Sequence, residues 1–143
     1  AGYRVVDVRV TVIDGKHHSV DGKETAFVTA GKKAFVQAMR EAQPIVLEPI
    51  VDVEISAPEA HIGDLTGDLA SRRGEVRGTD TLAAGLAVVR ARVPLAELSS
   101  YQTRLNSLTR GEGRYTLALS HFDAVPGNVQ AEMAKHFQLG DED

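Results

Sequence analysis

Two adjacent histidines, His17 and His18, are the residues whose type first suggests chemistry, because imidazole binds metals and exchanges protons near neutral pH. They fall in a polar loop between an expected strand and an expected helix, and not on one helical face where a metal site would need them. Asp21 follows, and its carboxylate suits the N-cap of that helix. On the residues alone we interpret both histidines as solvated and expect no metal.

A set of arginines forms the second group of candidates, because a guanidinium group donates paired hydrogen bonds to phosphate oxygens. One part of the set follows an expected helix and the other surrounds the end of a second helix: Arg72, Arg73 and Arg77, then Arg104, Arg110 and Arg114. A surface arginine alone is more often solvated or paired with a carboxylate than bound to a ligand. The clustering nevertheless favours phosphate contacts.

Residue type and charge exclude several other kinds of chemistry. The stretch Ala30-Gly31-Lys32-Lys33 superficially resembles a phosphate loop, but Ala26 stands where the first glycine is required and Lys33 where the hydroxyl should be. The formal net charge of −4 excludes binding of nucleic acid through a globally positive field, so any RNA contact must be local. We expect no catalytic residue and no cofactor site in this chain.

The elements that position the histidine loop follow from hydrophobic periodicity. Valines alternate with polar residues from Tyr3 to Ile13, which predicts a half-buried strand. Asp21 and Glu24 have the spacing of a capping box, and apolar residues then recur at helical spacing from Thr25 to Ala42. One strand and one helix are too small to bury their own apolar faces, so we expect this piece to be the end of a truncated domain.

Beyond Pro44 the pattern changes to strand, helix, strand, strand, helix, strand. This βαββαβ order predicts an α+β, ferredoxin-like fold, with two helices on one face of a sheet and the first and third strands adjacent. Pro58 and Pro94 are expected to open the two helices. Three residues are expected to line the inner face of the last strand: Tyr115, Leu117 and Leu119.

The outer face of that sheet is expected to carry acidic residues on one strand and basic residues on its neighbour. Asp52 and Glu54 alternate with apolar residues in the first strand, and Arg90 and Arg92 do so in the third. If the two strands are neighbours, opposite charges meet across them and contribute about 0.2–1 kcal/mol per pair. Charged central strands also argue against an RNA-recognition motif, which stacks bases on aromatic side chains.

Four motifs occur in the order expected for one family. They are Val46-Leu-Glu-Pro-Ile50, the run Gly63-Asp-Leu-Thr-Gly-Asp-Leu-Ala-Ser-Arg-Arg-Gly74, Val93-Pro-Leu-Ala-Glu-Leu98 and Thr109-Arg-Gly-Glu-Gly-Arg-Tyr115. Together they resemble the C-terminal part of translation elongation factor G. The resemblance implies that residues 1–44 are the C-terminal remnant of domain IV, a ribosomal-protein-S5-like domain, and that residues 45–143 are domain V, ferredoxin-like, with its C-terminal helix.

By this resemblance the parent protein is a cytoplasmic GTPase that drives translocation of transfer RNA and messenger RNA on the ribosome. GTP and Mg²⁺ would bind an N-terminal domain outside this chain, so the fragment itself is not expected to be an enzyme. Its expected partners are ribosomal RNA and the acceptor-site transfer RNA and messenger RNA, with no membrane contact, and we expect a monomer unless the exposed surface of the domain IV remnant drives association. His18 aligns with the histidine at the domain IV tip, beside His17 and Asp21, and the arginines named above become candidates for ribosomal RNA contacts.

The chain departs from the family pattern at several positions, which keeps other functions open. His17 replaces an aromatic residue common there, Gly22-Lys23 replaces two serines, and Leu98-Ser-Ser-Tyr101 lacks the usual aromatic residue and glycine. A ribosome-protection protein or a second elongation-factor-like copy is one alternative. Another, from a different class, is a regulatory ferredoxin-like module that binds small ligands at subunit interfaces.

Overall fold

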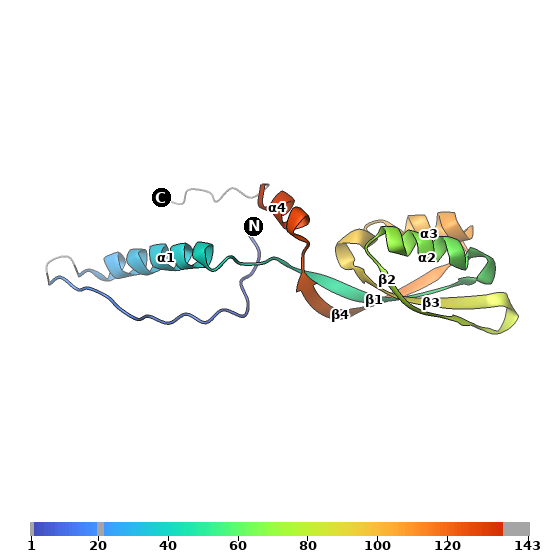
Figure 1. Ribbon diagram of the computed structural model, residues 1–143, viewed down its shortest axis with the longest axis horizontal. Helices are drawn as coiled ribbons and strands as arrows, with labels where there is room; N and C mark the ends of the chain where they lie inside the picture. The colour runs from blue at the N-terminus through green and yellow to red at the C-terminus, as the bar shows by residue number, and fades with distance from the viewer. Residues whose placement is uncertain (1, 20–21, 136–143) are drawn as a thin grey trace. The chain divides into compact units, whose positions relative to one another are not determined.

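The computed structural model describes residues 2–19 and 22–135, which form two compact units. One unit contains the chain before Leu47 together with helix α4 (Gly127–Lys135), and the other is Leu47–Val125 (Figure 1). Helix α4 therefore groups with the first unit by compactness. None of the described helices is long and apolar enough to cross a membrane.

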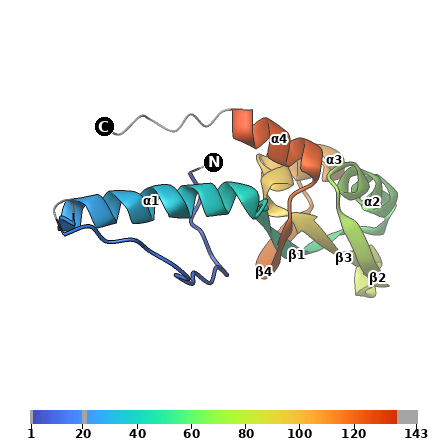
Figure 2. The same cartoon turned by 60° about the vertical axis from the view of Figure 1, so that its left-hand side comes forward.

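The second unit is a four-stranded antiparallel sheet with two helices on one face. Its strands are β1 (Leu47–Pro58), β2 (Glu75–Thr81), β3 (Leu86–Pro94) and β4 (Arg114–Ala124), and their order in the sheet is β2-β3-β1-β4. Helices α2 (Ile62–Ser71) and α3 (Tyr101–Thr109) lie on the same face in both Figure 1 and Figure 2. This arrangement confirms the predicted ferredoxin-like fold, in which the first and third strands are neighbours.

The core of this unit is organised by the alternation of β1. Val51, Val53, Ile55 and Ala57 are each at most 4% exposed, whereas Asp52 and Glu54 between them are exposed. Residues of β3 and of the helical face complete the core: Val89, Ala91, Val93, Leu65, Leu69, Leu98, Tyr101 and Leu105. Each large apolar side chain buried in this way contributes about 1.5–3 kcal/mol, so the helices are held to the sheet mainly by this face.

Opposite charges meet on the other face of the sheet, as predicted. Asp52 stands opposite Arg92 and Glu54 opposite Arg90 in the β1–β3 register. Nε of Arg92 lies 2.9 Å from Oδ1 of Asp52, and Nε of Arg90 lies 3.1 Å from Oε2 of Glu54. Arg90 also forms an ion pair with Asp80 of β2. These exposed pairs contribute at most about 1 kcal/mol each, so they specify the register more than they stabilise the fold.

The two prolines that were expected to open helices end strands instead. Pro58 is the last residue of β1 and Pro94 is the last residue of β3. A short 3₁₀ helix follows each proline, Glu59–His61 and Leu95–Leu98, before α2 and α3 begin. Proline fixes φ near −65°, which suits the end of a strand as well as the first turn of a helix, so the sequence pattern could not separate the two.

The outer strand β4 also differs from the prediction. Leu117 and Leu119 stand opposite Val53 and Val51 and so share the face of the core, yet they are 41% and 62% exposed. The reason is that β4 is an edge strand, while α2 packs on β2 and β3 at the other side of the sheet. Tyr115 does pack against the core, with its ring edge-on to Tyr101 at 5.3 Å between centroids.

In the first unit, the predicted strand from Tyr3 to Ile13 is wrong. The described residues 2–19 contain no strand, and their apolar side chains are exposed, up to 93% at Ile13. A period of two forms a strand only where a neighbouring strand supplies hydrogen bonds, and none stands beside this segment in the described structure.

Helix α1 (Glu24–Glu41) matches the predicted helix, but its start differs. The N-cap position is Lys23, and no side chain caps the helix there. The expected cap, Asp21, lies outside the described residues. Near the other end of this unit, the side-chain amide of Gln130 in α4 accepts a hydrogen bond from the Val46 N–H at 3.2 Å and donates one to the Pro44 carbonyl at 3.1 Å.

We expect Gly74→Ala to lower the free energy of unfolding by about 1–3 kcal/mol. The Gly74 N–H donates to the Leu69 carbonyl at 2.9 Å, and an added Cβ would lie 2.5 Å from the same oxygen, so the backbone would have to move. Gly67→Ala in α2 is the matched control, because nothing lies within 4 Å of its Cβ position and alanine favours a helix by about 0.5–1 kcal/mol. Urea denaturation followed by circular dichroism measures both, and similar losses for the two variants would contradict the steric argument.

Candidate functional site

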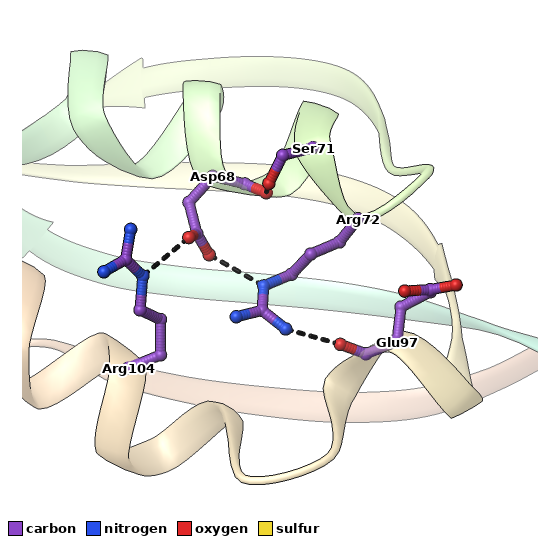
Figure 3. A network of polar contacts seen from close by, with 5 residues as sticks. All are labelled: Asp68, Ser71, Arg72, Glu97 and Arg104. Carbon is purple, nitrogen blue, oxygen red and sulfur yellow. Dashed lines mark hydrogen bonds and ion pairs between the residues drawn. The ribbon is translucent and has the colours of Figure 1, made fainter.

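Asp68 joins the two helices of the second unit through two of the candidate arginines. Its carboxylate, whose side chain is 6% exposed, accepts hydrogen bonds from Nε of Arg72 at 2.8 Å and from Nε of Arg104 at 2.7 Å (Figure 3). Burial alone would raise the pKa of Asp68, but the hydrogen bonds from Arg72 and Arg104 outweigh burial and hold that pKa below its usual value. The acid is therefore ionised at neutral pH and anchors both arginines.

Arg72 is further fixed by two other groups. Its Nη1 donates to the Glu97 carbonyl oxygen at 2.6 Å, and its guanidinium lies 5.2 Å from the centre of the Tyr101 ring. Burial, the largest effect, raises the pKa of Tyr101 to about 12, and the Tyr101 hydroxyl has no hydrogen-bond partner in the described structure. Tyr101 is thus a neutral core residue, and Arg72 is a structural residue that covers it.

Arg73 and Arg77 are also occupied by carboxylates. Arg73 donates two parallel hydrogen bonds to Glu48, at 2.7 and 2.9 Å, and a third to Glu97 at 2.9 Å. The hydrogen bond to Glu48 is the main reason that the pKa of Arg73 rises above its usual value. Arg77 donates to Glu75 at 3.0 Å in an exposed pair.

Arg110 and Arg114 remain as the candidates without a carboxylate partner in the described part of the chain. Every other arginine of Leu47–Val125 forms an ion pair, and this unit contains no lysine. Arg110 follows α3 with φ 54°, and Arg114 begins β4, so both exposed side chains flank one short turn.

The turn between these two arginines is itself well fixed. The Gly113 N–H donates to the buried Thr109 hydroxyl at 2.8 Å, and a Cβ on Gly113 would lie 2.7 Å from the same oxygen. Gly111 has φ 85°, a conformation that glycine adopts without strain. The backbone therefore holds the two guanidinium-bearing residues close together in the chain, on either side of a rigid turn.

The histidine loop carries two side chains in different situations. The His17 ring stacks on the Phe27 ring, with centroids 5.8 Å apart and an interplanar angle of 8°. His18 is exposed and contacts no partner group in the described structure, and Asp21 lies outside it. Among residues 2–19 and 22–135, no cluster of three histidine, aspartate or glutamate side chains could hold a metal.

Sequence reasoning missed the carboxylates that engage the arginines. Asp68 and Arg72 are four residues apart on one helix, which is a spacing that predicts an ion pair and could have been recognised. Glu48 lies 25 positions before Arg73 and Glu97 lies 24 positions after it, and no local pattern predicts such pairs. Of the candidate residues named from the sequence, Arg110, Arg114 and His18 are those without a partner group in the described structure.

Comparison with known proteins places both units within one family. Residues 1–43 match the family described as elongation factor G, domain IV, and residues 45–133 match the elongation factor G C-terminus. Elongation factor G of Aquifex pyrophilus is 48% identical over 129 residues, which cover 90% of this chain and 18% of that protein. A crystal structure from Thermus thermophilus superimposes with a TM-score of 0.68 at 40% identity, covering 85% of this chain and 18% of that one. The chain thus spans less than a fifth of the length of these relatives.

We expect the Asp68 ion pairs to make the free energy of unfolding depend on pH. Because the pKa of Asp68 is lowered in the folded protein, its contribution is present above about pH 4 and is lost as pH falls through the folded-state pKa. Asp68→Asn should lower the free energy of unfolding by about 2–4 kcal/mol at pH 7, and this difference should shrink towards pH 2. Urea unfolding at a series of pH values measures it, with exposed Asp64→Asn on the same helix as the control. A constant difference between wild type and Asp68→Asn from pH 7 to pH 2 would contradict the assignment.

Proposed function

Because the chain belongs to the elongation factor G family, we propose that it forms the end of domain IV and the C-terminal domain of a ribosomal translocase. The observation that carries this proposal is that both family models match in order along nearly the whole chain. The ferredoxin-like unit and the free cationic side chains at one turn support it, since a docking domain needs a rigid frame and local anion-binding groups.

In this proposal the chemical step takes place outside the chain. GTP and Mg²⁺ bind the nucleotide-binding domain of the parent, whereas this segment binds the ribosome and extends towards its acceptor site. The second unit contacts ribosomal RNA of the large subunit. The histidine loop of the first unit enters the acceptor site of the small subunit, where it meets transfer RNA and messenger RNA in the cytoplasm.

Among the arginines, we assign the RNA phosphate contact to Arg110 and Arg114. A guanidinium group that already binds carboxylates has fewer N–H donors left for phosphate, and the carboxylate beside it repels a second anion; this applies to Arg72, Arg73 and Arg104. Arg110 and Arg114 break no described ion pair when they bind an anion. Their site is local, as the negative net charge of the chain requires.

Replacing the free arginines should weaken ribosome binding in a salt-dependent manner. In the full-length factor that carries this sequence, Arg110→Gln and Arg114→Gln should each reduce the slope of log affinity against log salt by about 1, with unchanged stability. Arg73→Gln is the matched control, because its loss should reduce the free energy of unfolding by about 1–3 kcal/mol and leave the slope unchanged. Ribosome binding at several salt concentrations measures this. The assignment would be wrong if Arg73→Gln reduced the slope while Arg110→Gln and Arg114→Gln did not.

His18→Ala should slow translocation in the full-length factor while ribosome-stimulated GTP hydrolysis stays nearly unchanged. An exposed loop residue without partners contributes less than about 0.5 kcal/mol to stability, so a large kinetic effect must come from lost contacts with the ribosome. Rapid-mixing measurements of translocation and of phosphate release follow both steps. An unchanged translocation rate would make His18 a solvated loop residue and would favour a divergent paralogue that does not translocate.

A further inference from the structure

The two adjacent histidines differ in what they contact. His17 lies parallel to the ring of Phe27, which belongs to the first turns of α1, at 5.8 Å between centroids. His18, the next residue, is exposed and has no partner group in the described structure. The first histidine therefore connects the loop to the helix, and the second is left free to bind something else.

The His17 ring also lies beside the position that a side chain of residue 22 would occupy. A Cβ added at Gly22 would come within 2.8 Å of Cδ2 of His17 and within 3.0 Å of the His18 carbonyl oxygen. The imidazole thus occupies the space where any side chain at position 22 would stand. The loop approaches the start of α1 closely only because residue 22 has no side chain and residue 17 has a flat ring.

We infer that His17 is a positioning residue, whose stack on Phe27 fixes the loop against α1 and thereby holds His18 in one orientation. This inference rests on the proposed function, in which His18 is the group that meets the ribosome. A free loop would sample many directions, and the rotational freedom lost on binding would lower the rate of the step that depends on His18. What the stack requires of residue 17 is a flat ring, and not a proton or a charge.

Three single variants and one double variant in the full-length factor test this inference. His17→Ala should slow translocation about two- to tenfold, which is the range expected for one aromatic pair, with little change in the ribosome concentration that gives half the maximal rate. His17→Phe should restore the rate to within about twofold. Phe27→Leu should slow translocation as His17→Ala does, and the double variant His17→Ala/Phe27→Leu should be no slower than either single variant.

Val28→Ala is the matched control for Phe27→Leu, because Val28 is also exposed on α1, at 63%, and has no ring that could stack on His17. It should leave the translocation rate unchanged. In the free factor, Phe27→Leu should also move the ring-proton resonances of His17 in a histidine-labelled nuclear magnetic resonance spectrum, because the ring current of Phe27 is lost. Unshifted resonances would overturn the inference.

The outcomes separate this inference from the proposed function. If His18→Ala slows translocation but His17→Ala does not, the positioning role is overturned and the proposed function stands. Additive effects of His17→Ala and Phe27→Leu, or failure of His17→Phe to restore the rate, would also overturn the positioning role, because His17 would then act through its own contacts. If neither histidine affects the rate, both are overturned.

Discussion

The two-residue period of β1 is the constraint on which the second unit depends. This strand lies between β3 and β4, so its register decides which side chains of both neighbours face the helices. A shift by one residue would bring Asp52 and Glu54 into the core and expose Val51 and Val53, at a loss of several kcal/mol. The ion pairs with Arg90 and Arg92 on the open face select the same register independently. Both faces of one strand therefore specify a single sheet.

Once the sheet is formed, the ion pairs of Asp68 and Arg73 connect helix α2 to the neighbouring elements. Asp68 joins α2 to α3 through Arg104, while Arg73 joins the end of α2 to Glu48 of β1 and to Glu97. Arginines that a sequence motif groups together thus serve different purposes, because most of them hold helices in place. Within the described residues of this unit, the guanidinium groups without an ion pair are those of Arg110 and Arg114, on either side of the turn between α3 and β4.

Local patterns predicted those parts of the structure that local physics determines. The pairing of β1 with β3 followed from alternating residues, because both the apolar and the charged positions required it. The strand expected from Tyr3 to Ile13 was wrong, because periodicity does not reveal whether a partner strand is present. Leu117 was expected to be buried, because the alternating pattern places it on the face of the sheet that the helices cover. The pattern does not show how far the helices extend over that face, and Leu117 is 41% exposed. For the candidate site, the family resemblance singled out His18, whose role stays a prediction, and the ion pairs of Arg73 could not be foreseen because Glu48 lies far away in the sequence.

The division between arginine and lysine has a practical consequence for labelling. The second unit carries its positive charge on arginine alone, and the lysines all belong to the first unit: Lys16, Lys23, Lys32, Lys33 and Lys135. Guanidinium groups do not react with the activated esters that acylate amines near neutral pH, because they stay protonated. Fluorophores, cross-linkers or immobilisation chemistries directed at amines would therefore attach to the first unit and leave the ferredoxin-like surface unmodified.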